Sequence, residues 1–156
     1  DGGAILYVSY FDLMVRLRYF GIDNAWKRWS QILARYRLPD RLCGGSPLYT
    51  GETSQQEAAG SVGVDYPFAE SGLVPCFLLY GVIGVEATEG GGLAITPHLP
   101  KSLNYAEIHG INWRGAALSI EATRATVTVS GIDKAGRAVK KSYAIPKSGT
   151  VVARAG

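Results

Sequence analysis

The spacing of the hydrophobic residues changes once along the chain, at three consecutive glycines at positions 90–92. Between residues 5 and 36, apolar side chains recur every three or four residues, which is typical of amphipathic helices. After the glycines, short segments of alternating apolar and polar residues are bounded by Gly, Pro or Asn, which is typical of strands. The chain is therefore expected to be α+β, with helices first and strands second. A boundary near residue 88 divides it into 1–88 and 89–156.

Three helices are predicted before the boundary. The first ends at Phe20, because Gly21 can adopt the left-handed conformation that follows many helices. Asp23 is then expected to cap a second helix that runs to Tyr36. The short link predicts that the two helices lie antiparallel. A third helix over residues 73–83 is apolar on nearly all sides, so other elements must cover it.

Six strands are predicted after the boundary. They cover residues 93–97, 106–113, 117–123, 126–132, 138–145 and 150–154. The sequence Asp133-Lys-Ala-Gly136 between two of them predicts a hairpin turn. Together these segments favour an antiparallel sheet or a small β-sandwich.

Composition excludes several classes of function. With 47% hydrophobic and 19% charged residues among 156, the chain is expected to fold. The net charge of +3 is not gathered into a stripe, so no nucleic-acid partner is expected. The longest apolar stretch, residues 72–85, is too short to cross a membrane, so no membrane partner is expected either. Two cysteines and two histidines without ligand spacing predict no metal site, and no cofactor is expected.

The chain opens on Asp1-Gly-Gly and runs at once into a helical pattern. Two other helices cannot cover every side of a third helix that is apolar on nearly all sides. Both features lead us to expect a fragment of a longer protein.

Three stretches resemble a known group of enzymes. One stretch is Asp1-Gly-Gly-Ala together with Gly-Ile-Asp-Asn-Ala at residues 21–25. Another is Asn112-Trp-Arg-Gly-Ala-Ala-Leu-Ser-Ile. The strongest is residues 80–100, which end in Gly-Leu-Ala-Ile-Thr-Pro-His-Leu-Pro. Together they resemble the six-hairpin glycosidases, most densely over residues 63–123. Relatives in that superfamily include α-L-rhamnosidases, α-L-fucosidases, trehalases, and maltose- and cellobiose-type phosphorylases.

The resemblance implies a fold and partners. Residues 1–88 would be the last helices and an active-site loop of an (α/α)6 barrel, and residues 89–156 a C-terminal β-sandwich. The implied partners are a carbohydrate substrate and the missing N-terminal part of the same enzyme. The usual proton donor of these enzymes lies earlier in the barrel than this sequence reaches. The fragment is therefore not expected to be active alone.

A polar loop over residues 38–70 holds the candidate chemistry. Glycoside hydrolysis needs two carboxyl groups, one that donates a proton and one that activates water or attacks the sugar. The loop supplies acidic side chains together with aromatic side chains that can stack on a sugar ring. The acids are Glu52, Glu57, Asp65 and Glu70, and the candidate substrate-binding aromatics are Tyr49, Tyr66 and Phe68.

The resemblance implies catalytic roles for some of these acids. Glu52 lies about where rhamnosidase-like and trehalase-like relatives place their general base, and Asp65 resembles an acidic residue of fucosidase-like relatives. Glu70 is a third candidate, although an acidic residue at a helix start also stabilises the helix by about 0.3–1 kcal/mol. Glu57, beside two glutamines, is most simply a solvated charge.

Two alternatives stay open. The chain could be a noncatalytic carbohydrate-binding or scaffold module, with Trp113 and tyrosines of the sheet stacked on sugar. An exposed row of aromatic side chains on one sheet face would favour that module. Within the enzyme class, part of a glycoside phosphorylase is the other alternative.

Overall fold

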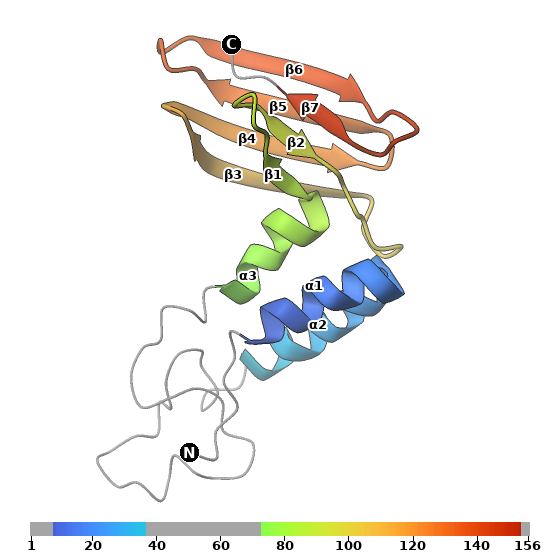
Figure 1. Ribbon diagram of the computed structural model, residues 1–156. Helices are drawn as coiled ribbons and strands as arrows, with labels where there is room; N and C mark the ends of the chain where they lie inside the picture. Colours follow the sequence, from blue (N-terminus) through green and yellow to red (C-terminus); the bar gives the residue numbers. More distant parts are fainter. Residues whose placement is uncertain (1–7, 37–72, 154–156) are drawn as a thin grey trace, which may run out of the picture. The chain divides into compact units, whose positions relative to one another are not determined.

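The computed structural model describes residues 8–36 and 73–153 (Figure 1). The chain divides into two compact units, Asp1–Phe77 and Leu78–Gly156, and each is described by itself. The first holds helices α1 (Val8–Phe20), α2 (Ile22–Tyr36) and α3 (Leu73–Phe77). The second begins with a π-helical segment, η3 (Leu78–Ile83), and continues with strands. The predicted order, helices first and antiparallel strands second, is confirmed. The boundary near residue 88 and the assignment of residues 1–88 to a barrel stay predictions.

In the helical unit, α1 and α2 lie side by side and are joined by one residue (Figure 1). That residue is Gly21, whose φ of +82° is the left-handed conformation predicted for the end of α1. Helix α2 begins at Ile22, so Asp23 lies inside its first turn instead of capping it. A carboxylate in the first turn still interacts favourably with the helix dipole.

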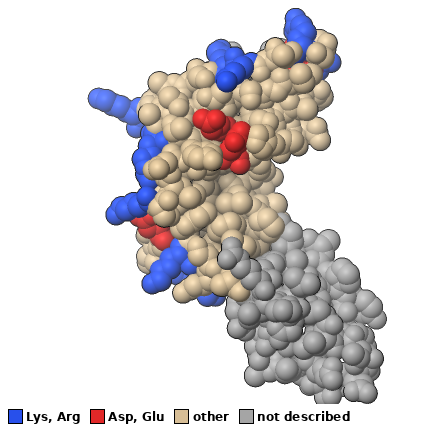
Figure 2. Space-filling model, turned by 180° about the vertical axis from the view of Figure 1, so that it is seen from behind, with Lys and Arg blue, Asp and Glu red and all other residues tan. Residues whose placement is uncertain are grey.

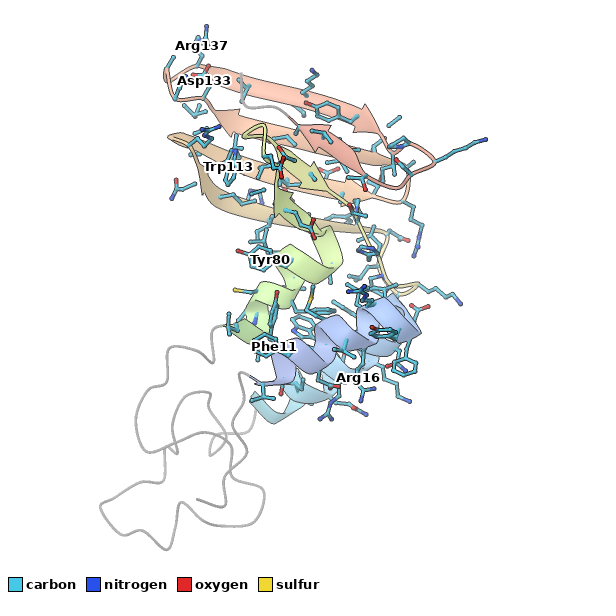
Figure 3. The ribbon with its side chains drawn as sticks, in the orientation of Figure 1. Phe11, Arg16, Tyr80, Trp113, Asp133 and Arg137 are labelled. Carbon is cyan, nitrogen blue, oxygen red and sulfur yellow. The ribbon has the colours of Figure 1, made fainter. Side chains whose placement is uncertain are left out.

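Helices α1 and α2 are held together by apolar packing and by one network of polar side chains. Leu13 and Trp29 are buried, and the Trp29 ring lies 6.5 Å from the Phe77 ring of α3. On the polar side, the Asp12 carboxylate accepts a hydrogen bond of 2.9 Å from Arg16 Nε (Figure 3). Arg16 also bonds to Asn24 of α2, and Arg28 of α2 lies 3.4 Å from the same carboxylate.

Another face of α1 is apolar but exposed. Val8, Phe11, Val15 and Tyr19 are between 50% and 69% exposed and share one face of the helix. The buried Leu13 lies on a different side. Within the described ranges, no helix is long and apolar enough to cross a membrane.

The second unit contains two antiparallel sheets, in the orders β1-β2-β7 and β3-β4-β5-β6. The strands are β1 (Val85–Ala87), β2 (Leu93–Ile95), β3 (Tyr105–Trp113), β4 (Ala116–Thr123), β5 (Thr126–Ile132), β6 (Ala138–Ala144) and β7 (Val151–Ala153). All six predicted strands are present within two residues of their expected ends. The prediction missed β1, which precedes the glycine run.

The two sheets share one hydrophobic core. Ile95 and Val151 of the smaller sheet and Ile120 and Val127 of the larger sheet belong to the same cluster of buried side chains. Alternate residues of β4 and β5 point into this core, as the period of a strand requires. The sheets therefore pack face to face, with β3–β6 behind β1, β2 and β7 in Figure 1.

The junction between η3 and β1 brings two backbone segments unusually close together. Gly84 has a φ of +71°, and a Cβ built on it would lie 2.0 Å from the carbonyl oxygen of Thr96. The Thr96 N–H donates to the Gly84 carbonyl at 3.0 Å, and the His98 N–H donates to the Val82 carbonyl at 2.8 Å. Only a glycine fits at position 84.

We predict that Gly84→Ala lowers the free energy of unfolding by about 2–5 kcal/mol, because it adds both the left-handed conformational cost and a backbone clash. Gly90→Ala is the matched control, since a Cβ at position 90 meets nothing within 4 Å. It should stay within about 0.5 kcal/mol of the wild type. Urea unfolding followed by circular dichroism measures both. Equal stability of the two variants would contradict this account of the junction.

Arg124, in the turn between β4 and β5, holds the segment that leads into β3. Its Nη2 donates to the carbonyls of Pro100 at 2.9 Å and Leu103 at 3.1 Å, and Nη1 reaches the Leu99 carbonyl at 3.4 Å. This contact is not predicted by the sequence, because Arg124 lies more than 20 residues from each of these three carbonyls.

We predict that Arg124→Met lowers the free energy of unfolding by about 1.5–3 kcal/mol, the net contribution of hydrogen bonds to a charged group. Lys147→Met, in an exposed turn, removes a positive charge without these carbonyl contacts and is the control. The readout is the urea midpoint at a fixed pH. If Lys147→Met costs as much stability as Arg124→Met, the charge and not the carbonyl contacts is responsible.

The predicted hairpin turn between β5 and β6 is confirmed. The Gly136 N–H donates to the Asp133 carbonyl at 2.9 Å, and the Asp133 carboxylate accepts from the backbone N–H groups of Ala135 and Arg137. The Arg137 guanidinium lies 2.8 Å from the same carboxylate (Figure 3). The hydrogen bonds from Arg137, backbone first and then side chain, lower the pKa of Asp133 below its ordinary value of 3.8 and outweigh burial, which raises it.

We predict that Asp133→Asn is less stable than the wild type at neutral pH and that this difference decreases as the pH falls below 3.8. Because the pKa of Asp133 is lowered by folding, the ionised carboxylate stabilises the folded state above pH 3.8, and this stabilisation is lost as the pH falls through the folded-state pKa. Urea unfolding of both proteins between pH 7 and about pH 2 tests this. A stability difference that does not change with pH would contradict it.

Candidate functional site

The acidic loop that carried the predicted chemistry lies outside the described residues. The predicted catalytic acids Glu52, Asp65 and Glu70 and the predicted sugar-binding residues Tyr49, Tyr66 and Phe68 all fall in residues 37–72. Their roles therefore stay predictions. Within the described part of the chain, the candidate site has to be built from the sheet unit.

A groove lies between the two sheets, on the inner side of β6. Its volume is about 470 Å³. The larger sheet has four strands and the smaller has three short ones, so the smaller sheet leaves the inner face of β6 partly uncovered. The register places Val139, Lys141 and Tyr143 of β6 opposite Gly131, Val129 and Val127 of β5, so they face the core side of the sheet. We call this space the β6 groove.

The β6 groove has an apolar floor and a basic rim. Leu93, Leu118, Val129 and Ala153, all at most 8% exposed, line the floor. The charged lining residues are Arg114, Asp133, Lys134, Lys140 and Lys141. Asp133, which carries the one negative charge among them, is bound by Arg137. Arg114, Lys134 and Lys141 thus give the rim its positive charge beside one paired carboxylate, whereas Lys140 alternates with Lys141 and points to the other face of the sheet.

The end of the groove at the β3–β4 turn is held in place by two side chains. Arg114 and Gly115 form a two-residue turn in which both φ angles are positive, 51° and 84°. The Trp113 indole N–H donates to the Gly91 carbonyl at 3.2 Å, and Arg114 Nη1 reaches the same oxygen at 3.4 Å. These bonds join the β1–β2 loop to the larger sheet. In Figure 3, Trp113 lies toward the same end of the sheets as Asp133 and Arg137.

The outer face of the larger sheet is polar. Figure 2, seen from behind, shows acidic side chains near the middle of this face, and the register pairs Glu107 with Glu121. His109 Nδ1 lies 3.0 Å from the Ser119 hydroxyl and His109 Nε2 lies 3.1 Å from the Glu107 carboxylate. The order serine, histidine, carboxylate is that of a hydrolytic triad, but the His109 side chain is 69% exposed on an open sheet. An open face neither binds a substrate nor excludes water, so this cluster organises the sheet surface.

This outer face does not carry the row of aromatics that a sugar-stacking module would need. Of the three aromatic residues in β3–β6, only Tyr105 lies on it; Trp113 and Tyr143 line the β6 groove. Trp113, which the module alternative would stack on sugar, lines the groove and donates its indole N–H to the Gly91 carbonyl.

His98 packs at the helix end. Its Nδ1 lies 3.1 Å from the Gly81 carbonyl, within hydrogen-bonding distance of η3. Among the residues that the structure describes, no three His, Cys, Asp or Glu side chains converge as metal ligands would.

The β6 groove is not predicted by the sequence. One signal was available: Val139, Lys141 and Tyr143 alternate along β6, and a lysine between two apolar residues on one face is typical of an edge strand. That pattern predicts an edge but not the cavity beside it, because the cavity depends on the strand count of the other sheet.

Comparison with known proteins finds one similarity. No curated protein and no solved structure matches the chain. Residues 87–139, about a third of the chain, do match a family model, and these residues run from the end of β1 into β6. Within the sheet unit, the chain is therefore similar to the C-terminal domain of glycosyl hydrolase family 65.

Proposed function

We propose that this chain is the C-terminal part of a carbohydrate-active enzyme that cleaves glycosidic bonds with two carboxyl groups. The observation that carries the proposal is the family match over residues 87–139, in a unit of antiparallel sheets that follows helices in the chain. This order agrees with the one that the six-hairpin resemblance implies. The substrate class under this proposal is a carbohydrate.

In the proposed mechanism, the loop over residues 38–70 contributes at most the general base. Glu52 is the first candidate and Asp65 the second, with Tyr49, Tyr66 and Phe68 as sugar contacts. The proton donor comes from a part of the enzyme outside this sequence. A base that accepts a proton from the attacking water as the bond to the anomeric carbon forms contributes about 10²–10⁴-fold to the rate.

Phosphorolysis is the second candidate reaction. The matched family includes glycoside phosphorylases as well as hydrolases, so phosphate can replace water as the nucleophile. A noncatalytic sugar-binding module has less support, because the outer face of the larger sheet presents only Tyr105 among its aromatic residues.

We predict that Glu52→Gln, in an enzyme that contains this sequence together with its proton donor, lowers kcat by about 10²–10⁴-fold while sugar affinity and folding are retained. The variant keeps the size and hydrogen bonding of the side chain but removes its basic oxygen. Glu57→Gln is the matched control in the same loop and should keep wild-type turnover. Assays with and without inorganic phosphate, which follow free sugar and sugar phosphate, distinguish hydrolysis from phosphorolysis.

Asp65→Asn separates the two candidate bases. Loss of turnover in Asp65→Asn with normal turnover in Glu52→Gln would move the role to Asp65. Normal turnover in both would show that this loop carries no catalytic base and would overturn the proposed mechanism.

A further inference from the structure

We infer that the β6 groove binds a small amphiphilic organic anion, with an apolar body on the groove floor and an acidic head group at the basic rim. None of the described residues that line it belongs to the acidic loop of the proposed function, and the inference does not depend on which glycosidic reaction the enzyme performs. The inference rests on the shape, lining and charge of the groove.

The shape fits a small ligand. Small-molecule sites usually have volumes of about 300–1,000 Å³, and the β6 groove has about 470 Å³. Its lining follows β6 from Ala138 to Tyr143, which is about 17 Å at the rise of an extended strand. The groove therefore suits an extended molecule that lies along β6.

The apolar floor of the β6 groove favours a ligand with an apolar body. Leu93, Leu118 and Val129 present hydrocarbon to the groove, and each is nearly buried. A polar ligand such as a neutral sugar would lose hydration at its hydroxyl groups without gaining hydrogen bonds there, which is unfavourable. Binding of a hydrocarbon chain or an aromatic ring to the same surface is favourable, because apolar surface is removed from water.

The basic side chains at the rim of the β6 groove favour a ligand with a negatively charged head group. Lys134 and Lys141 make no ion pair with any residue that the structure describes. The Lys141 Nζ lies 5.2 Å from the centre of the Tyr143 ring, on the groove side of β6. An anion is the complement of this unneutralised charge.

Protection of a free sheet edge accounts for only part of this arrangement. Inward-pointing lysines on edge strands hinder pairing with another chain, and Lys141 fits that role. Lys134 and Arg114 lie in turns, not on the edge strand, yet they line the same groove. Charge therefore gathers around the cavity itself.

The test uses dodecanoate as the probe, with dodecanol as its neutral analogue, on the full chain. The readout is the NMR signal of the Trp113 indole N–H, assigned with Trp113→Phe, because this ring lines the groove. We expect dodecanoate to shift this signal in a saturable way, and we expect dodecanol to bind at least about fivefold more weakly. Added salt should weaken dodecanoate binding.

Substitutions locate the site. Val139→Trp fills the groove and should abolish the shift, whereas Val152→Trp, at another exposed valine of the same unit that does not line the groove, should leave it unchanged. Lys141→Gln and Lys134→Gln should each weaken binding about two- to fivefold, as for an exposed ion pair. Lys147→Gln, outside the groove, is the control and should bind as the wild type does.

Three results would overturn the inference: an unmoved Trp113 signal at millimolar dodecanoate, equal binding of dodecanol, or wild-type binding by folded Val139→Trp. If Val139→Trp does not fold, Lys141→Gln is compared with Lys147→Gln, and equal binding of dodecanoate by these two variants would overturn the inference. None of these results bears on Glu52 or Asp65, so the proposed enzymatic function stands or falls separately.

Discussion

The close approach of two backbone segments at Gly84 determines how the sheet unit is assembled. The last carbonyls of a helix lack partners within it, and here the segment after β2 supplies them through the N–H groups of Thr96 and His98. The His98 ring adds a contact to Gly81. Position 84 has no room for a Cβ, so the helix end and this segment are held together. This contact places Val85 opposite Ile95, which is the first pair in the register of β1 and β2.

The position of the smaller sheet in turn determines which part of the inner face of the larger sheet is left uncovered. Strand β2 pairs with β1 on one side and β7 on the other, and each of the three strands has only three residues. Such a sheet cannot cover four strands of seven to nine residues. The uncovered part is the inner face of β6. The β6 groove is therefore a direct consequence of the unequal strand numbers and lengths of the two sheets.

The sequence predicts the elements that have a long, regular pattern and misses those that do not. Residues 126–132 alternate cleanly, with Val127 and Val129 buried, and β5 has the predicted bounds. Strand β1 has three residues, too few for a period of two to be recognised. The π-helical form of η3 escapes prediction because a segment that is apolar on all sides has the same pattern in either helix type.

The candidate sites show the same limit. The acidic loop at residues 38–70 could be proposed from sequence because carboxylates and aromatics cluster there along the chain, although the structure does not describe it. The β6 groove could not, because its lining combines residues from Leu93 to Ala153 that only the folded sheets bring together. A local concentration of side chains is visible in a sequence, whereas a cavity between elements is not.

The extent of the family match also separates the two sites. The match begins at residue 87 and ends at residue 139, so it includes Arg114 and Lys134 but not Lys141. The groove is thus completed by residues beyond the segment that is similar to the family 65 C-terminal domain. The glycosidic chemistry is proposed for a loop before that segment. The family similarity, the proposed reaction and the β6 side of the groove therefore involve three different stretches of the chain.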